Sequence, residues 1–525
     1  MQVDWVNNIK NEPYFDVRSY KAKCDGVHDD APAINATIIA AGLVNGVVYI
    51  PPGVCLVKSP LYMLAKTVIT GAGINSTVIS VDASFSLASL GVFISQTYYE
   101  PGTTVRNLTV SFIQPDSTDI AAYTHWPSAF YMVATPRFTL ENIQVLRAWD
   151  GVNMTGNSGG AIITNFQCSS FNKGIQIDNS LDSVYLTQIR FWNYGLTTNQ
   201  SSIFGTTPGN YGLYLGRTDG LQVLDFYGGV TTAIHIDGSG INGAASADLS
   251  NINIDGLSKI EIIGPSYLTI SNIKITENSI GTYIPLSITG IDAVVSISNM
   301  ELYPGINGGI NTAIYYAGSG KSTLQITNLW AWRVNSDTTI IEQHSGSLLV
   351  TNSYFNRYPN IAYTNPTISI IGGRASLIGN RTTDKGTGAG TFISIVNDDW
   401  HQSRGNTAVG WTMAYPAIKT SGVYEDGEVS FLPSSYLNLA SNEVGVNNAI
   451  IPLFGYPMAL VPGLSVSVIL AHSLQAGANT VNVNSQGAIA LKSGKNPAND
   501  IAVAYVTGAL LTVVWNGSVW LDISQ

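Results

Sequence analysis

Short runs of alternating apolar and polar residues recur along most of this chain, and each contains an asparagine followed by a hydrophobic residue. In the run from Tyr267 to Asn278, the apolar positions follow a period of two that is interrupted once, at Ser271-Asn272. These runs do not show the period of 3.6 that is expected of a helical repeat. The recurring pairs are Asn107-Leu108, Asn142-Ile143, Asn165-Phe166, Asn251-Ile252, Asn272-Ile273, Asn299-Met300 and Asn328-Leu329.

Neighbouring copies of this pair lie about 21 to 29 residues apart, with wider gaps where loops intervene. Repeats of that length indicate a solenoid, and two or three short strands per repeat indicate a parallel β-helix. The inward side chains of the example run are then Leu268, Ile270, Ile273 and Ile275. Residues far apart in sequence would stack about 4.8 Å apart on a long lateral sheet. The asparagines are interpreted as structural, because asparagine tolerates the left-handed turn conformation and stacks in hydrogen-bonded ladders.

Most polar positions hold uncharged residues, since only 11% of the 525 residues are charged. This composition is typical of tightly wound strands and turns. The net charge of −10 argues against nucleic acid and anionic membranes as partners, because both need clustered basic residues. No stretch is apolar enough to span a bilayer, and the N-terminus lacks the layout of a signal peptide. Cys24, Cys55 and Cys168 are too few and scattered for a disulfide framework or metal site, so we expect buried reduced thiols.

A short helix is expected near the N-terminus, between two strands. Asp30 is a plausible N-cap, Ala31-Pro32 would open the helix, and Gly42 lies close to its expected end. Its apolar face would consist of Ile34, Ile38 and Ile39. A β-helix has an exposed apolar end, and a helix of this kind can cover it.

This N-terminal segment resembles the opening of the pectate-lyase-like β-helix superfamily that is found in phage tailspikes. The matching positions are Asp16-Val17, Tyr20, Ala22, Asp25-Gly26, Asp29-Asp30, Ala33-Ile34, Gly46 to Gly53 and Gly71 to Thr77. Lys21 and Cys24 depart from the pattern, since glycine is usual at both positions. The resemblance implies an all-β, right-handed parallel β-helix, in a superfamily that includes hydrolases, lyases and epimerases. Turn and cap duty is the preferred interpretation of Asp25, Asp29 and Asp30.

From about Ser421 the repeat pattern stops, and the alternating runs that follow predict antiparallel strands. Residues 513–520 predict a hairpin with an Asn516-Gly517 turn. The strand Asn479 to Asn484 and the hairpin Trp515 to Leu521 are similar to the terminal module of many phage tail fibres, which helps trimerise or binds sugar in those relatives. The predicted division is a cap with first rungs (1–80), a β-helix carrying the substrate groove (81–420) and a C-terminal antiparallel β module (421–525).

Together the two resemblances imply a phage tailspike, a homotrimer of the virion tail that binds and cuts a bacterial surface polysaccharide, with a capsule as the expected target. The chain begins almost at the cap, so attachment to the tail or baseplate is expected through a segment absent here or through another protein. The calcium-binding aspartates and arginine base of pectate lyases are not evident, and neither are the catalytic motifs of polygalacturonases. A hydrolase is therefore preferred to a lyase, and no metal or cofactor is expected.

Candidate chemistry lies on the strands that line the substrate groove in the resembling family. Their aliphatic residues point inward, so the intervening residues point outward. One outward column is predicted to hold Asn153, Gln176, Tyr214, His235, Glu261 and Ser287. A second column is predicted to hold Asp178, Gly216 and Asp237. In a chain with so few charges, the concentration of charged residues on adjacent rungs favours a functional site over a solvated sheet surface.

Asp237 and Glu261 are predicted to divide the general-acid and general-base roles, because stacked carboxylates raise each other's pKa. Their carboxylates would lie about 7–8 Å apart. That separation fits inverting glycoside hydrolysis, at about 6.5–9.5 Å, better than the roughly 5 Å of a retaining pair. His235 and Asp178 complete the predicted catalytic group by positioning the sugar. The predicted substrate-binding residues are Tyr214, Lys259, Gln176, Asn153, Arg217, Glu277, Trp330 and Trp332.

A second candidate group is expected on loops near strand ends, where surface duty is the preferred interpretation. It consists of Glu277, Glu301, Glu342 and His344. Trp192, Trp330 and Trp332 are predicted to point outward, which suits sugar stacking and, equally, a subunit interface in a trimer.

Three other functions stay open at this point. The first is a lyase that acts on an acidic glycan by β-elimination, with Lys259, His235 or Tyr214 as the base. The second is a non-enzymatic adhesin whose groove only binds glycan. The third, a purely structural fibre, would leave the charged cluster unexplained.

Overall fold

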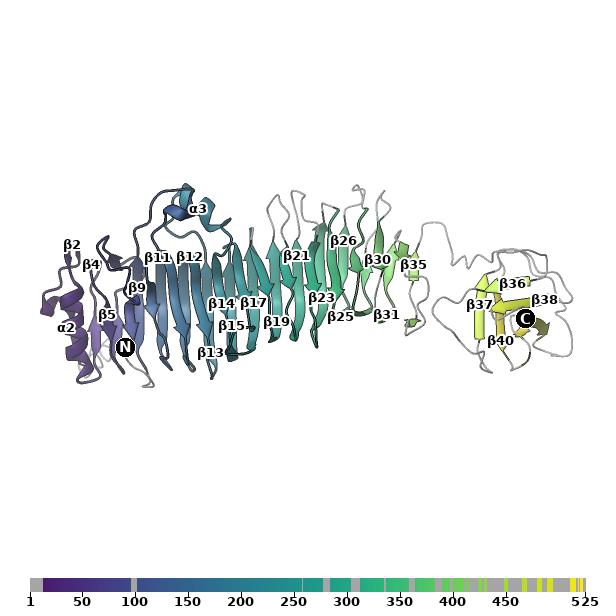
Figure 1. Ribbon diagram of the computed structural model, residues 1–525, viewed down its shortest axis with the longest axis horizontal. Coiled ribbons are helices and arrows are strands. Elements are labelled where there is room, and N and C mark those ends of the chain that lie inside the picture. The colour runs from purple at the N-terminus through teal and green to yellow at the C-terminus, as the bar shows by residue number, and fades with distance from the viewer. Residues whose placement is uncertain are drawn as a thin grey trace, which may run out of the picture.

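We describe the fold from a computed structural model of the 525-residue chain. The described residues are 13–95, 102–256, 258–276, 284–303, 312–334, 337–357, 364–382, 390–396, 400–409, 412–414, 424–426, 429–431, 448–451, 465–469, 479–483, 489–493, 510–515, 518 and 520–522. Strands β1 to β35 pair in one continuous ladder, and the pairs between successive turns of the solenoid are parallel. The chain forms a right-handed parallel β-helix, which confirms the predicted fold class (Figure 1).

Each turn of the solenoid contributes to three faces. Face I holds the segment before the asparagine turn, face II the segment directly after it, and face III the segment beyond the next connection. Between β11 (Thr139–Thr155) and β12 (Ile162–Asp178), residue 140 pairs with 163 on face I, 143 with 166 on face II, and 152 with 175 on face III. The paired residues are buried aliphatic or aromatic side chains, and their period of two fixes which neighbours point outward.

The strand bounds follow this plan along the chain. The first strands are β1 Tyr14–Asp16, β2 Asp25–Asp29, β3 Val47–Tyr49, β4 Gly53–Val57, β5 Leu61–Met63, β6 Val68–Thr70, β7 Thr77–Val81, β8 Gly91–Ser95, β9 Thr104–Ser111 and β10 Ser128–Tyr131. Faces I and II then share β13 Val184–Phe191, β15 Thr218–Gly228, β17 Ala245–Asp255, β19 Ser266–Thr276, β21 Ala293–Tyr303 and β23 Thr323–Val334. Face III consists of β14 Tyr211–Leu215, β16 Thr232–Ile236, β18 Lys259–Ile262, β20 Leu286–Ile288, β22 Thr312–Ala317, β24 Thr339–Ser345, β27 Ile368–Ile370 and β30 Thr391–Ile395.

The recurrent asparagines form the predicted ladder at the turn between faces I and II. All seven have a positive φ, as in Asn142 at 53° and Asn272 at 52°. The side-chain amide of Asn142 donates to Asn107 Oδ1 at 2.9 Å, and Asn272 donates to Asn251 Oδ1 at 3.2 Å. The same bond joins Asn165 to Asn142, Asn299 to Asn272 and Asn328 to Asn299. The structural interpretation of these residues is confirmed.

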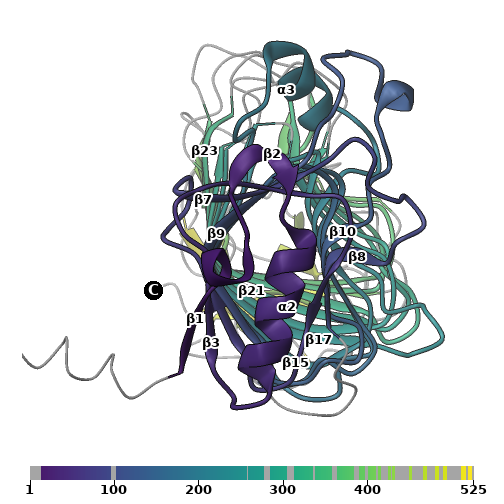
Figure 2. The ribbon, with the colours of Figure 1, turned by 90° about the vertical axis from the view of Figure 1, so that its left-hand side faces the viewer.

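The helix α2 (Ala31–Gly42) lies across the N-terminal end of the solenoid, as expected (Figure 2). Ile34 and Ile38 are fully buried beneath it, whereas the prediction for Ile39 is wrong, since that side chain is 59% exposed. Ile34 and Ile38 are four residues apart and share one helix face, whereas Ile39 is rotated by about 100° from Ile38 and leaves that face. Neither α2 nor the helix α3 (Thr198–Phe204) is long and apolar enough to cross a membrane.

The three aspartates of this end bond to backbone N–H groups, which agrees with turn and cap duty. Asp30 occupies the N-cap position of α2, but its carboxylate accepts from the backbone N–H groups of Lys23 and Cys24, at 2.7 and 3.1 Å. Lys21 and Cys24, which replace the usual glycines, both have a positive φ, of 79° and 48°. Glycine is favoured at positive φ, so Lys21 and Cys24 adopt the backbone conformation of the glycines that they replace.

The expectation of three reduced thiols is wrong for two of them. Cys24 and Cys55 form a disulfide, and Cys168 is a buried free thiol. The pairing joins residues 31 positions apart, one preceding β2 and one within β4, which pair in parallel. The Asp30 carboxylate lies near both sulfurs. Disulfide sulfurs have no thiolate to offer a metal, so this group is not a metal site.

The parallel ladder extends beyond residue 420, through β34 (Tyr424–Asp426) and β35 (Val429–Phe431). A separate sheet has the order β36-β38-β39-β41-β40-β37, and the hairpin pairs Trp515 with Trp520 as predicted. The sheet is mixed rather than antiparallel, since β36 pairs with β38 and β39 with β41 in parallel. Alternation predicts strands but does not specify their partners. The bounds of this sheet's strands are β36 Asn448–Ile451, β37 Ser465–Ile469, β38 Asn479–Val483, β39 Ile489–Ser493, β40 Leu510–Trp515 and β41 Trp520–Asp522.

Candidate functional site

The first predicted outward column is present on face III. Its residues pair in the order Asn153, Gln176, Tyr214, His235, Glu261 and Ser287. The column continues to Tyr315 and then to Glu342. Because the buried aliphatic neighbours hold the register, each of these side chains projects from the same side of the sheet.

His235 and Glu261 form the centre of this column. His235 Nδ1 lies 2.9 Å from Glu261 Oε2, and Lys259 Nζ lies 2.9 Å from the other oxygen, Oε1. The hydrogen bond from His235, with a further one from Lys259, lowers the pKa of Glu261 to about 2. Glu261 is therefore ionised at neutral pH, and its carboxylate fixes the orientation of the imidazole.

Two tyrosines flank the imidazole. The rings of Tyr211 and Tyr214 each lie 4.7 Å from the His235 ring, and Lys173 Nζ lies 4.4 Å from the centre of the Tyr214 ring. Burial raises the pKa of both phenols, with additional contributions from the charge of Glu261 at Tyr211 and of Asp237 at Tyr214. Both phenols are protonated at neutral pH and can donate hydrogen bonds. We call Lys173, Tyr211, Tyr214, His235, Lys259 and Glu261 the imidazole cluster.

The prediction that stacking raises carboxylate pKa values is wrong for Glu261. The nearest charged partners of this carboxylate are a histidine and a lysine, so the shift has the opposite sign. Glu261 is consequently unsuited to be the general acid. The separation between the carboxylates of Asp237 and Glu261 stays a prediction.

Asp178 and Asp237 lie at the predicted second column, and both bond to turns. Asp178 accepts from the Arg217 backbone N–H at 2.9 Å and from Asn242 Nδ2 at 2.7 Å. A Cβ at Gly216 would lie 2.4 Å from Asp178 Oδ1, so only glycine lets this carboxylate lie along the column. Asp237 Oδ1 accepts from the backbone and hydroxyl of the adjacent Ser239. Within the described chain its Oδ2 has no hydrogen bond.

The remaining predicted residues of face III have local roles. Asn153 Oδ1 accepts from the Thr155 N–H at 3.1 Å and from its hydroxyl at 2.9 Å. The Arg217 side chain pairs with Asp219 at 3.1 Å rather than with the cluster. Gln176 is half-buried between Asn153 and Tyr214 in the column.

Other predicted residues lie elsewhere. Trp330 and Trp332 are on β23, in face II, where their rings stack at 4.5 Å. Glu277 lies outside the described residues. Glu342 and His344 are on the strand β24 rather than on a loop, and Glu342 shares the column of His235. The sequence did not separate face II from face III for these residues, because both faces show the same alternation.

Lys173 and Tyr211 belong to the cluster but were missed in the sequence. Each directly precedes a glycine, Gly174 or Gly212, on consecutive rungs, and the two residues pair in register. That repeated residue-plus-glycine pattern at the start of the face III strands is the signal that could have found them.

Residues 14–222 match the sequence model of the family described as rhamnogalacturonase A/epimerase, pectate lyase-like. The matched part contains the cap and the rungs up to Tyr214 but not His235 or Glu261. A non-secreted LysM effector, LysM15, from Penicillium expansum is 30% identical over 190 residues, which is 31% of this chain. The match spans only 13% of the length of that relative. The chain therefore has a pectate-lyase-like β-helix whose similarity is concentrated in its N-terminal part.

Three solved structures are similar to this chain at a low level. The catalytic unit of a GH87 α-1,3-glucanase from Streptomyces thermodiastaticus has a TM-score of 0.39 at 13% identity, covering 79% of this chain and 68% of that one. The pre-mature gene product 12 of bacteriophage phi29 has a TM-score of 0.46 at 14% identity, covering 82% and 68%. The adhesin PfbA of Streptococcus pneumoniae has a TM-score of 0.37 at 13% identity, covering 98% and 99%. Similarities of this size carry no information about the site.

Proposed function

We propose that this protein is a phage tailspike that hydrolyses glycosidic bonds in a bacterial surface polysaccharide, with the imidazole cluster at its active site. The observation that carries the proposal is the bond between His235 Nδ1 and Glu261 Oε2, 2.9 Å long, on the lateral sheet of a β-helix. A carboxylate that fixes one ring nitrogen leaves the other, Nε2, to exchange a proton. The pectate-lyase-like family match of residues 14–222 supports action on a glycan.

In this proposal the general base is a histidine and the general acid is an aspartate, rather than two carboxylates. His235 takes a proton from a water molecule, and Glu261 stabilises the imidazolium that forms. The water oxygen bonds to the anomeric carbon, the glycosidic C–O bond breaks, and Asp237 gives its proton to the leaving oxygen. Oδ2 of Asp237 is the atom assigned this proton, because the hydrogen bonds that Ser239 donates to this carboxylate both go to Oδ1.

Access to His235 constrains the mechanism, because its side chain is only 5% exposed. A proton can reach Nε2 through a hydroxyl of Tyr211 or Tyr214, or after one of these rings rotates. The column itself supplies binding groups at a spacing of about 4.8 Å. Gln176 and Tyr214 lie on neighbouring rungs and would bind successive sugars of a glycan that runs along the solenoid axis, with Lys173 beside Tyr214.

A β-eliminating lyase is the second candidate. The observation that favours it is Lys173, whose ammonium lies over Tyr214 and has no carboxylate within salt-bridge distance among the described residues. Such a cation would neutralise the carboxylate of a uronic acid. Of the three bases considered for this reaction, Lys259 is bound to Glu261 and the pKa of Tyr214 is raised, which leaves His235.

Mass spectrometry of capsular polysaccharides incubated with the protein tests the proposal. Fragments that equal whole repeat units plus one water are expected for a hydrolase. Fragments that lack this water and absorb near 235 nm would instead establish the lyase. Intact polymer that still binds, across a broad strain panel, would leave an adhesin. A monomeric mass in light scattering would refute the trimer.

The Asp237→Asn variant tests the acid role. We expect turnover to fall by at least about 100-fold, because the amide cannot protonate the leaving oxygen. Asp219→Asn is the matched control, since Asp219 is an exposed partner of Arg217 outside the cluster. Equal activity of the two variants, with unchanged thermal unfolding, would remove Asp237 from the mechanism.

A further inference from the structure

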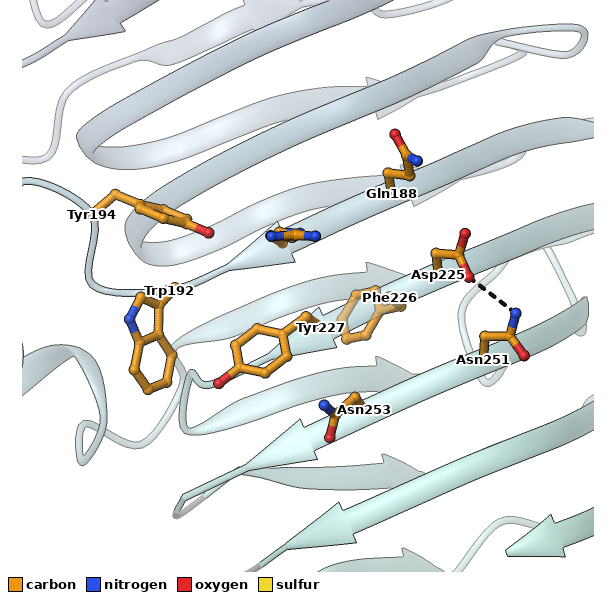
Figure 3. Close-up of a pocket in the computed structure, with 9 residues that line it drawn as sticks. Gln188, Trp192, Tyr194, Asp225, Phe226, Tyr227, Asn251 and Asn253 are labelled. Carbon is orange, nitrogen blue, oxygen red and sulfur yellow. Dashed lines mark hydrogen bonds between the residues drawn. The ribbon is translucent and has the colours of Figure 1, made fainter. Parts of the chain in front are cut away.

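A second surface with the chemistry of a sugar site lies on face II, away from the column of the imidazole cluster. It is a groove of about 650 Å³ along the outer side of β13, β15 and β17 (Figure 3). Trp192, Tyr194 and Tyr227 lie side by side at one end, with Asn253 on the next rung. Trp192 and Tyr227 meet edge to face at 5.5 Å, and Trp192 is 37% exposed.

The glycine that follows β15 explains the position of Trp192. A Cβ at Gly229 would lie 2.2 Å from the indole carbon Cε3, so the indole lies over this glycine. Below it, the Tyr227 hydroxyl donates to Asp255 Oδ2 at 3.2 Å, and burial raises the pKa of Tyr227 to about 12. The phenol is thereby held as a fixed donor and the ring as a fixed platform.

Arg190 supplies a cation to the same groove. Its side chain is exposed, it lines the groove, and it pairs in register with Tyr227. No hydrogen bond or ion pair of the guanidinium is present within the described part of the chain. The nearby Asp225 accepts from Asn251 at 3.0 Å. An exposed guanidinium beside aromatic platforms is suited to bind a carboxylate or another planar anion.

The groove continues along the solenoid into a second hollow. This hollow, of about 350 Å³, is lined by Lys274, Glu301 and Trp330 on the following rungs. The outward residues of face II pair in the order Arg190, Tyr227, Asn253, Lys274, Glu301 and Trp330. Five steps of about 4.8 Å place the two ends of this row about 24 Å apart. Trp330 is 43% exposed and stacks on Trp332.

We propose that face II is a second glycan-binding site, distinct from the imidazole cluster. It takes a linear glycan that runs along the solenoid axis, stacks sugars on Trp192 and Trp330, and places an anionic group of one sugar on Arg190. We call the surface from Arg190 to Trp330 the aromatic groove. Glycan binding at the aromatic groove does not depend on cleavage, because no residue of the imidazole cluster lines this groove.

The composition of the aromatic groove favours a glycan over a second copy of this chain. The cores of protein interfaces are depleted of charged residues. Here Arg190, Lys274 and Glu301 all line the hollows between the aromatic ends. Aromatic rings separated by polar and charged side chains match a polymer whose sugars present apolar ring faces and hydroxyl edges in alternation.

The test measures binding to an array of purified bacterial surface polysaccharides. It uses the full-length protein in the His235→Gln background, so that cleavage does not affect the signal. Trp192→Ala and Trp330→Ala are each expected to weaken binding at least about fivefold, since one stacked ring contributes about 1 kcal/mol or more. Tyr185→Ala is the matched control, because Tyr185 is an aromatic side chain on the same strand, β13, that is 41% exposed but lies on face I.

The anionic contact is tested with matched ligands. Acidic polysaccharides that bind are reduced at their carboxyl groups and measured again. Arg190→Gln is expected to weaken binding of the native polymer severalfold and to leave binding of the reduced polymer unchanged. Equal binding of native and reduced polymers, or an equal effect of Arg190→Gln on both, would overturn the anionic contact.

Two outcomes would overturn the second site as a whole. One is binding by the Trp192 and Trp330 variants that equals the control, or no binding of any acidic polysaccharide. The other is dissociation of the oligomer in light scattering by these variants, which would make face II an interface between copies of this chain. Neither outcome bears on the proposed hydrolysis, which fails if the wild-type protein leaves the polymer intact or releases fragments that lack the added water.

Discussion

Within the described residues face III carries two histidine–glutamate pairs whose glutamates share one column, and their surroundings differ. His235 and Glu261 lie on neighbouring strands, and the His235 side chain is 5% exposed. Glu342 and His344 lie on one strand, β24, three steps further along the column or about 14 Å away, and His344 is 37% exposed. The first pair depends on the stacking of rungs, whereas the second needs only one strand.

The pairs differ in what holds each carboxylate and what encloses each imidazole. Glu261 has its second oxygen bound by Lys259, and His235 is enclosed by two tyrosine rings. Glu342 has its second oxygen bound by the Thr312 hydroxyl, and His344 contacts one ring, that of Tyr315, at 5.1 Å. A cation on the carboxylate and a low-dielectric enclosure fix the charge and the orientation of the first pair. The second pair is held by a neutral donor and remains open to solvent.

The largest expected effect comes from replacing the enclosed imidazole. His235→Gln should lower turnover by about 10²- to 10⁴-fold, because glutamine can accept a hydrogen bond but cannot take up a proton. The measurement is the release of reducing ends from a polysaccharide substrate. Melting temperatures must show that the variant is folded. Substantial turnover by a folded variant would make His235 a structural residue.

Glu261→Gln should have the next largest effect, a fall in turnover of at least about 100-fold. The amide keeps the shape of the side chain but cannot stabilise a positively charged imidazole. The measurement separates kcat from KM, because loss of a role in the chemical step should lower kcat. A change confined to KM would mean that Glu261 only binds the sugar.

The ionisation of Glu261 also predicts a pH dependence of stability. Its pKa in the folded state is about 2, below the ordinary value of 4.5, so the unfolded chain takes up a proton more readily as the pH falls. The stabilisation is fully present above about pH 5 and is lost as the pH falls toward 2. Melting temperatures at pH 6 and pH 3 should therefore differ more in the wild type than in Glu261→Gln. An equal difference in both proteins would show that the contacts of Glu261 with His235 and Lys259 do not stabilise the fold.

The smallest effect is expected at the exposed pair. His344→Gln should leave turnover within about threefold of the wild type, because surface pairs of this kind contribute little. The same reducing-end assay applies, and the comparison with His235→Gln uses an identical substitution on the same face. A loss comparable to that of His235→Gln would place His344 in the active site and remove the distinction between the pairs.

The sequence was sufficient to predict the β-helix, the asparagine ladder and the column from Asn153 to Ser287, because buried aliphatic residues at a period of two fix which neighbours point outward. It was not sufficient for contacts between rungs at strand ends. Tyr211, at the start of β14, contacts the His235 ring on the neighbouring strand β16, and the alternation of apolar and polar residues does not predict such a contact. The ionisation of Glu261 was also missed, since it depends on which charges lie within hydrogen-bond distance. The Cys24–Cys55 disulfide was missed because its two cysteines are separated in sequence by the helix α2 and are brought together only by the pairing of β2 with β4.

The asparagine turns keep a constant length, whereas the connections at the other two edges of the solenoid vary. Each turn between faces I and II uses a single left-handed residue that hydrogen-bonds to the next rung, so an insertion there would break the ladder. The connections between faces II and III range from 229–231 and 256–258 to 192–210, which includes α3. New segments can therefore be acquired in the connections between faces II and III, beside both the imidazole cluster and the aromatic groove, without altering the register of any strand. Exchange of these connections would change the surface beside both sites while the scaffold stays constant.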